Sequence, residues 1–347
     1  MPDITPGLLV AFAAMVALNA YALLAGADFG GGVWDLFATG ERQERQRKLI
    51  ANAMGPVWEA NHVWLILVVV LLFTGFPAAF SRLAITLHIP LTLMLIGIVL
   101  RGSAFIFRSY DSQADLVQRR WGLVFSVASL LTPILLGMML GAVASGTLIA
   151  GAGDGSGSLA SLYVRPWLTP FTISTGVFAV VLFAFLAAVY LTVEAREPAL
   201  ENDFRRRALL AGVAVLATAG IALFLASREE SGAPLMWRGL VHSPWAIPLQ
   251  AAIALAGLGT CMALWWRRYY LARVTAAAQV SLILWGWVLA QFPYLVPPDI
   301  TIESAQTPAV TLRLLLIALA IGGVLLIPSL YYLFRVFKSE RAGAPGR

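Results

Sequence analysis

The segment Val57-Trp58-Glu59-Ala60-Asn61-His62-Val63-Trp64 opens an apolar run that continues to Phe76. It places a carboxylate and an imidazole about one helical turn apart, at the start of a stretch long enough to cross a membrane. Ionisable side chains are costly to insert into a membrane, and those found there commonly line a polar path, an ion site or a proton relay. A second acid, Asp28, lies near the end of the preceding apolar run. What these two acids face therefore decides the function of the chain.

The composition indicates an all-α, polytopic membrane protein. Of 347 residues, 60% are hydrophobic and only 12% are charged, whereas roughly a quarter of a soluble domain is charged. The strands of a membrane β-barrel would be ~10 residues long with alternating polarity, a pattern that this sequence lacks. The single cysteine, Cys261, excludes a disulfide framework and a CxxC-type metal or iron–sulfur site. The net charge of +6 is not taken as a sign of nucleic-acid binding, because in a membrane protein the positions of the charges matter more than their sum.

Apolar runs of about 20 residues or longer predict nine membrane-spanning helices. These runs cover about 7–34, 55–76, 83–107, 121–150, 168–193, 208–227, 245–266, 276–297 and 311–337.

The basic residues predict how these helices are oriented. Of the 24 Lys and Arg residues, 18 fall in the loops 35–54, 108–120, 194–207 and 267–275 and in the C-terminal tail, and only five fall on the opposite side. The side with 18 is expected to be cytoplasmic, because cytoplasmic loops are enriched in Lys and Arg. The N-terminus is then outside and the C-terminus inside, as an odd number of spans requires.

The ionisable residues inside the predicted spans all lie in the first three spans: Asp28, Glu59, His62, His88 and Arg101. At the helical rise per residue, Asp28 lies ~31 Å along the first span, Glu59 ~6 Å into the second and Arg101 ~27 Å along the third. Because the second span runs in the opposite direction, these three residues and His62 come to the same level, in the cytoplasmic third. We expect them to form a proton relay, while His88 stands apart near the outer face.

Two plainer interpretations of this cluster remain open at the level of sequence. Asp28 and Glu59 could be boundary residues that reach the membrane interface without a function. Arg101 could pair with one acid only to fix the helix register. A relay is favoured because four such groups converge at one depth, and a buried acid beside a cation can exchange protons near neutral pH.

The glycines and histidines of the spans lead to two further predictions, one about helix packing and one about haem. Pairs of glycines four residues apart allow membrane helices to approach closely, so helix packing is expected at Gly26, Gly30, Gly137 and Gly141. A haem would need axial ligands at a suitable depth, but the two histidines within spans lie at different depths. No haem and no metal ion are therefore expected to be held by this chain alone.

Four separated motifs together resemble subunit II of cytochrome bd-type quinol oxidases, with the cyanide-insensitive branch most similar. The motifs are Gly26-Ala27-Asp28-Phe29-Gly30-Gly31-Gly32, Trp58–Leu65, Arg101-Gly102-Ser103-Ala104-Phe105 and the segment Gln291–Ile302. They occur in the family's order from the first span to the last. By composition alone, the segment Gln291–Ile302 predicts only a rigid, kinked helix exit.

The resemblance implies a pseudo-symmetric bundle and a place in a respiratory complex. The expected parts of this single membrane domain are a four-helix half over 1–150 with the polar cluster, a second over 168–297, and a ninth helix over 311–337. The implied partner is a subunit I that carries haems b and d, oxidises quinol and reduces O₂ in the bacterial inner membrane. A small single-helix subunit, membrane lipid and a structural quinone within this chain are further implied possibilities.

The family's proton-conducting acids map onto Asp28 and Glu59. Many relatives carry Asp at the second place and Gln before Val-Trp, where this chain has Glu59 and His62. Glu keeps the titratable group, so a relay role is retained. The resemblance assigns no role to His62.

Two other functional classes compete with an oxidase subunit. A stand-alone secondary transporter or ion channel would use the same acids to bind its ion, but such sites lie near the membrane midplane between two repeats. The charges here lie near one face and in one half of the chain. A subunit with a purely scaffolding role is the third alternative.

Overall fold

The computed structural model describes residues 5–54, 58–110, 115–148, 158–228 and 232–343, and these residues are almost entirely helical. The long helices are α1 (Pro6–Leu36), α3 (Trp58–Gly75), α5 (His88–Tyr110), α6 (Asp115–Ser145), α8 (Pro170–Glu194), α9 (Pro198–Ala226), α11 (Ala246–Trp265), α12 (Tyr269–Gln291) and α14 (Ala309–Gly343). The short elements are α2 (Gln43–Met54), α4 (Pro77–Thr86), α7 (Leu159–Tyr163), α10 (Pro234–His242), α13 (Ile302–Ala305) and the strands β1 (Tyr294–Val296) and β2 (Ile300–Thr301). Within the described residues, eight helices are long and apolar enough to cross a membrane, and α2 with α3 forms a ninth if this bent pair is one span.

The starts of several helices follow from local sequence. The Thr5 side chain accepts a hydrogen bond from the first turn of α1, and Thr169 and Thr172 form a reciprocal capping box at the start of α8. These hydroxyls satisfy amide groups that have no partner within the helix. Proline is favoured at the first helical position, where its missing N–H costs nothing, and α1, α8 and α9 begin with Pro6, Pro170 and Pro198.

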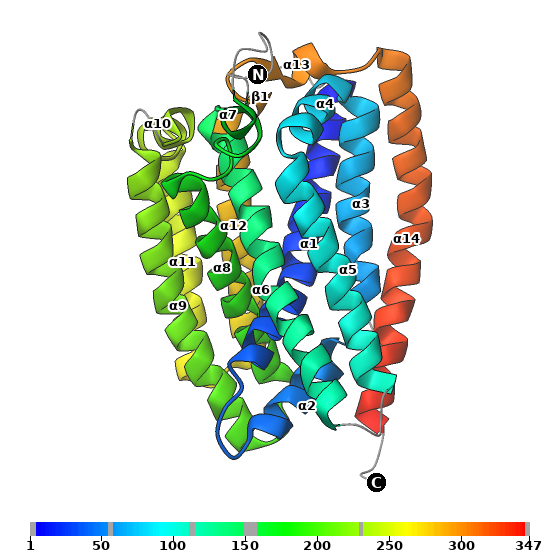
Figure 1. Cartoon of the computed structure of the whole chain (residues 1–347), viewed down its shortest axis with the longest axis vertical. Helices are drawn as coiled ribbons and strands as arrows, with labels where there is room; N and C mark the ends of the chain where they lie inside the picture. Colours follow the sequence, from blue (N-terminus) through cyan, green and yellow to red (C-terminus); the bar gives the residue numbers. More distant parts are fainter. Residues whose placement is uncertain (1–4, 55–57, 111–114, 149–157, 229–231, 344–347) are drawn as a thin grey trace.

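The helices lie side by side along the long axis, so the molecule has two distinct ends (Figure 1). α2 lies at one end, and α4, α7, α10, α13 and the β1–β2 hairpin lie at the other. We call the first the basic end, because α2, the helix connections beside it and the adjoining ends of the long helices carry Arg42, Arg45, Arg47, Lys48, Arg108, Arg196, Arg205, Arg206, Arg207, Arg267, Arg268 and Arg273. The basic loops predicted to share one side of the membrane thus share one end of the bundle.

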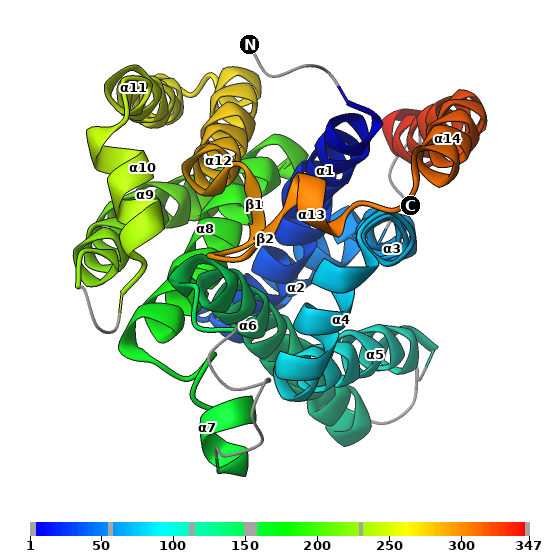
Figure 2. The same cartoon turned by 90° about the horizontal axis from the view of Figure 1, so that it is seen from above.

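The helices differ in how deeply they lie within the bundle. Viewed from above, α1, α6 and α8 occupy the middle, α9 to α12 lie on one side, and α3, α5 and α14 lie on the other (Figure 2). Over the most apolar 18 residues of each helix, 67% of the residues are buried in α8, whereas only 6% are buried in α14. α14 therefore turns most of its surface away from this chain.

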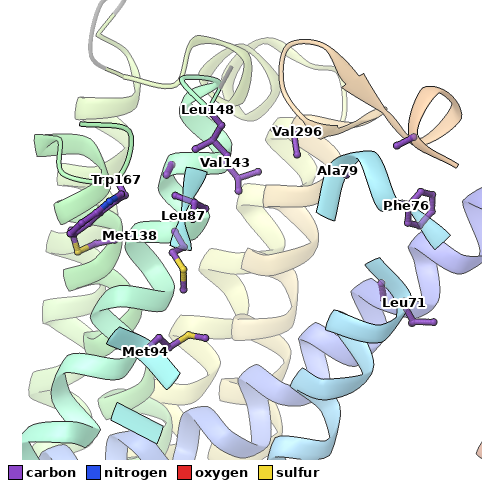
Figure 3. Packing of buried hydrophobic residues seen from close by; sticks show 14 of the residues in the cluster. Leu71, Phe76, Ala79, Leu87, Met94, Met138, Val143, Leu148, Trp167 and Val296 are labelled. Atoms are coloured by element: carbon purple, nitrogen blue, oxygen red, sulfur yellow. The ribbon is translucent and has the colours of Figure 1, made fainter. Parts of the chain in front are cut away.

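Apolar side chains hold the hairpin end together. Leu71 of α3, Met94 of α5 and Met138 of α6 belong to one buried cluster, which Val296 of β1 joins from above (Figure 3). In a membrane such contacts act through close packing rather than through the exclusion of water.

The four glycines predicted to mediate helix packing all lie at close contacts between helices. A Cβ atom at Gly26 would fall 2.7 Å from the Phe183 ring of α8, and one at Gly30 would overlap the Phe183 carbonyl oxygen. On α6, a Cβ atom at Gly137 would fall 2.6 Å from the Thr175 carbonyl oxygen of α8, and one at Gly141 would overlap the Thr175 hydroxyl. The backbones of α1 and α6 therefore approach α8 where a side chain would not fit.

Several predicted span boundaries differ from the structure; α9, for example, begins at Pro198, well before the predicted start at 208. The span predicted over 83–107 is divided, because α4 ends at Thr86 and α5 begins at His88. The span predicted over 276–297 ends early, at Gln291. The residue before a proline disfavours helical backbone, and Pro293 follows Phe292, the C-cap of α12.

The segment after α12 forms an ordered cap rather than a simple helix exit. Within Gln291–Ile302, β1 and β2 pair antiparallel, with Tyr294 opposite Thr301, and α13 follows directly. The predicted fourth span, 121–150, corresponds to α6, which ends at Ser145; its last two residues lie outside the described residues.

Candidate functional site

Three of the ionisable residues predicted within the spans, Asp28, His62 and Arg101, gather toward the basic end, where α1, α3, α5 and α6 meet. Asp28 of α1 accepts a hydrogen bond from the side-chain amide of Asn61 on α3. Asn61 is only 5% exposed, and Asp28 is partly buried. The amide therefore fixes the direction of the Asp28 carboxylate inside the bundle.

Arg101 of α5 is buried beside this pair, with 2% of its surface exposed. Its Nε donates to the Ser129 hydroxyl of α6 at 3.1 Å. The guanidinium carbon lies 4.9 Å from the centre of the Phe29 ring and 5.2 Å from that of Phe125, within range for cation–π attraction. Arg101 and Asp28 attract one another electrostatically, but they form no ion pair within 4.0 Å among the described residues.

His62 completes this group from α3. Its ring centre lies 5.8 Å from that of Tyr21 and 6.0 Å from that of Phe29, both on α1. Asp28, Asn61, His62 and Arg101 thus lie in one neighbourhood, which we call the Asp28 cluster.

Glu59 does not lie within the Asp28 cluster. Its side chain is exposed on the outside of α3, two residues before the buried Asn61. Residues two positions apart on a helix point to nearly opposite sides, which explains why one faces inward and the other outward. The outer stripe continues along α3 with exposed apolar residues: Val63, Ile66, Val70 and Phe73.

A second buried acid lies at the basic end, and the sequence reasoning did not single it out. Asp35 is 3% exposed, pairs with Arg108 at 3.1 Å and accepts a hydrogen bond from the Ser126 hydroxyl at 3.0 Å. The predicted first span stopped just before Asp35. The signal that could have found it is spacing, because Asp35 follows Asp28 by seven residues and Arg108 follows Arg101 by seven.

Asp35 lies at the wall of a polar cavity of about 520 Å³ between α1, α2, α5 and α6. The polar and charged residues of its lining are Asp35, Gln43, Glu44, Arg47, Arg108, Gln118 and Ser126. We call this space the basic-end cavity.

A network of charged residues ties α2 to α9 beside this cavity. Arg42 donates two hydrogen bonds to the Asp203 carboxylate, at 2.7 and 2.8 Å, and this pairing raises the pKa of the Arg42 guanidinium. Gln46 also donates to Asp203, at 2.9 Å, and accepts from Arg207 at 2.7 Å. α2 is thereby fixed to the rear half of the chain at the basic end.

A larger apolar cavity of about 550 Å³ lies among α1, α6, α8, α9, α11 and α12. Most of its lining is aliphatic or aromatic, and the polar side chains that reach it include Tyr21, Thr175, Gln250 and Gln279. The Tyr21 hydroxyl and the Gln279 carbonyl oxygen are buried without a hydrogen-bond partner among the described residues. This cavity thus offers an apolar space with polar atoms at its wall.

The histidines are not arranged as paired haem ligands. His62 lies in the Asp28 cluster, His88 begins α5 with its ring against Tyr163, and His242 ends α10. Among the residues that the structure describes, no three His, Cys, Asp or Glu side chains are grouped to hold a metal ion.

Comparison with known proteins places this arrangement in a family. The sequence profile described as cytochrome bd terminal oxidase subunit II matches residues 6–337. A Bacillus subtilis chain provisionally named cytochrome bd menaquinol oxidase subunit II is 22% identical over 334 residues, which covers 92% of both chains. Subunit 2 of the cytochrome bd-I ubiquinol oxidase of Escherichia coli K12 is 26% identical over 180 residues, covering 51% of this chain and 45% of that one.

A solved structure shows the same fold. In the bd oxidase from Geobacillus thermodenitrificans, one chain superimposes with a TM-score of 0.76 at 22% identity, covering 96% of this chain and 99% of that one. Subunits II of this family pair with a subunit I in a quinol oxidase complex, an oxidoreductase, and this favours an oxidase subunit over a stand-alone transporter or channel. The family profile covers nearly the whole chain, and the chain therefore belongs to the cytochrome bd terminal oxidase subunit II family.

Proposed function

We propose that this subunit conducts protons from the basic end toward the oxygen-reducing haem of subunit I. The observation that carries the proposal is the Asp28 carboxylate, held by the buried Asn61 amide with the buried Arg101 beside it. An isolated charge in a membrane is strongly disfavoured, so such groups are retained where they act on a proton or an ion. The basic end faces the cytoplasm of a bacterial inner membrane, because cytoplasmic loops are enriched in Lys and Arg.

The members of the Asp28 cluster have different roles in this proposal. Asp28 holds the proton, and Asn61 orients the carboxylate that receives it. Arg101 stays positively charged and balances Asp28 when the acid is ionised. His62 shields the cluster on the α3 side together with Tyr21.

Glu59 acts at the surface that faces subunit I. It begins the exposed stripe of α3, and a carboxylate turned toward lipid would be costly. In the complex, a partner surface covers this stripe, and Glu59 passes the proton from this chain to subunit I. α14, which is little buried in this chain, forms part of the same broad face beside α3 (Figure 2).

The chain is organised as one membrane domain with two four-helix halves and a ninth helix. α1, α3, α5 and α6 form the half with the Asp28 cluster, α8, α9, α11 and α12 form the other, and α14 adds the ninth helix. α8 packs directly on α1 and α6, so the two halves form one body.

The cofactors of the reaction belong to the rest of the complex. Haems b and d are carried by subunit I, which oxidises quinol, and a small single-helix subunit and lipid complete the assembly. The apolar cavity of this chain fits a structural quinone. Its aliphatic and aromatic lining can pack against an isoprenoid chain, and its polar atoms without hydrogen-bond partners among the described residues can bond a quinone head. Gln279 and Tyr21 would hold that head, and a quinone there would contribute packing.

The test is the oxidase activity of the purified complex that carries Glu59→Gln or Asp28→Asn. Each change removes a proton-accepting group at nearly constant shape, so O₂ reduction should fall at least tenfold while the KM for quinol stays within twofold. Glu303→Gln, an exposed acid on α13 at the hairpin end, is the matched control and should keep full turnover. Full turnover of both the Glu59 and the Asp28 variant would overturn the relay.

A further inference from the structure

We propose that the basic-end cavity is the water-filled inlet through which protons reach Asp28. This inference rests on the proposed function, because it identifies how the relay acid is supplied. Seven polar or charged residues lie at the wall of the cavity: Asp35, Gln43, Glu44, Arg47, Arg108, Gln118 and Ser126.

The position of Glu59 creates the need for such an inlet. Glu59 lies on the outer stripe of α3, and the residues that follow it on that stripe, from Val63 to Phe73, are apolar. That face meets lipid or a partner subunit, and neither supplies protons freely. The basic-end cavity, in contrast, combines a polar lining with a volume of about 520 Å³, enough for a cluster of waters.

An ion pair and a hydroxyl group lie at the wall of the cavity next to α1. Asp35 is almost fully buried, yet its carboxylate is compensated by Arg108 and by the Ser126 hydroxyl. A buried ion pair is stable only when its remaining donors and acceptors are also satisfied. Asp35 and Arg108 both line the cavity, so water that enters it from the bulk phase meets this ion pair at the end of α1.

A seam of polar and small residues leads from Asp35 to Asp28. On α1, Asp28, Gly32 and Asp35 are spaced at four and three residues and so share one face, with the two acids ~10 Å apart along the helix axis. On α6, Ser126 bonds Asp35 and Ser129 bonds Arg101, one helical turn deeper. The Ser126 hydroxyl thus lies against Asp35, and the Ser129 hydroxyl lies against Arg101, the cation beside Asp28.

Gly32 allows this seam to exist. A Cβ atom at Gly32 would overlap the Ser129 side chain, so only a glycine lets Ser129 lie against α1 between the two acid levels. The Ser129 hydroxyl accepts a hydrogen bond from Arg101 and donates one to the Phe125 carbonyl oxygen, so it passes a proton by rotating away from that carbonyl.

The path of the proton then begins in the basic-end cavity and ends at Asp28. A hydronium ion in the cavity gives up its proton, the hydroxyls of Ser126 and Ser129 and intervening water exchange it, and the Asp28 carboxylate receives it. Four charged residues face the seam: Asp28, Asp35, Arg101 and Arg108. The two arginines carry no proton along the path, because a guanidinium does not deprotonate in proteins.

The inlet is tested by plugging the cavity in the complex with subunit I. Gly122 lines the cavity, and a Cβ atom there would meet nothing closer than Arg108 at 3.9 Å, so the backbone at Gly122 has room for the Cβ of Gly122→Cys. In a Cys261→Ala parent, this cysteine is labelled with a maleimide that carries a polyethylene glycol chain. Labelling should lower O₂ reduction at least fivefold relative to the unlabelled variant, with the KM for quinol unchanged.

The matched control is Lys48→Cys, labelled in the same way. Lys48 is exposed on α2 at the same end of the molecule but does not line the cavity. Full turnover of labelled Gly122→Cys, or an equal loss in labelled Lys48→Cys, would overturn the inlet. If Asp28→Asn still slows the oxidase in that case, the proposed relay stands without this inlet.

A second set of variants tests the seam by rescue. Ser126→Ala should lower turnover severalfold, whereas Ser126→Thr, which keeps a hydroxyl, should restore it. Ser174→Ala removes another buried serine, whose hydroxyl donates to the Phe171 carbonyl within α8, and it should leave turnover unchanged. An unchanged haem spectrum shows that each complex is assembled. Equal turnover of the two Ser126 variants would contradict a relay through this hydroxyl.

Discussion

At the scale of the residue, two acids that the sequence places at the same depth lie in opposite surroundings. Asp28 is held inside the bundle by Asn61, whereas Glu59, on the same helix as Asn61, faces outward. A proton held at Asp28 must therefore cross α3 to reach Glu59 and the partner. Asn61, which bonds Asp28 from α3 and stands one position before His62, is placed at that crossing.

The contribution of Asn61 can be measured by removing its amide. Asn61→Ala leaves Asp28 without its donor, and hydrogen bonds to charged groups are worth ~1.5–3 kcal/mol. We expect about a tenfold fall in the O₂ reduction rate of the assembled complex, with quinol KM unchanged. Asn202→Ala on α9, which removes a hydrogen bond to Arg205 at the basic end, is the control. Wild-type turnover of the Asn61 variant would show that the amide does not position the acid.

At the scale of the element, α8 is the helix around which the bundle closes. It is the most buried of the candidate membrane spans, and glycines of both α1 and α6 lie against it. Because apolar burial drives little association between helices in lipid, contact at van der Waals distance carries more of the stability. The glycine pairs of the sequence mark where that contact is closest.

A pair of glycine variants separates packing from helix propensity. Gly30→Ala places a methyl group against the Phe183 carbonyl, and such overpacking costs ~1–3 kcal/mol. The complex should then lose its haem spectrum at a lower temperature in a thermal melt. Gly220→Ala on α9 meets nothing within 4 Å, and it should leave the melting temperature unchanged or slightly raised. Equal melting temperatures for both variants would contradict the close α1–α8 contact.

At the scale of the whole molecule, the basic end is joined across the two halves and the hairpin end is capped. Arg42 and Gln46 reach Asp203 at the start of α9, so α2 is fixed above the basic-end cavity. At the other end, the hairpin and α13 cover the cluster that contains Val296. The cavity and the Asp28 cluster are thus held by contacts far apart in the chain.

Removing the Arg42–Asp203 ion pair, which joins the start of α2 to α9, should loosen α2 without lowering the stability of the whole bundle. Asp203→Asn weakens the ion pair with Arg42, whose side chain is 40% exposed, so the loss should be ~1 kcal/mol or less. Hydrogen exchange of the α2 amides should become severalfold faster, while exchange in α8 stays unchanged. Glu197→Gln, which removes the more exposed pair with Arg45, is expected to change α2 less. Unchanged exchange in α2 of the Asp203 variant would show that other contacts hold this helix.

The sequence alone determined the helical membrane class, the likeness to bd oxidase subunits II and the gathering of basic loops at one end, because apolar run length and charge position are properties of the chain. It also placed Asp28, His62 and Arg101 at one level, since helix rise converts residue number into depth. Only the tertiary structure decided which way each side chain points: Asn61 inward, Glu59 outward, and Asp35 into an ion pair with Arg108. The direction of a side chain depends on which helices pack together. That packing is set by contacts between residues far apart in the sequence, such as the contact of Gly30 of α1 with Phe183 of α8.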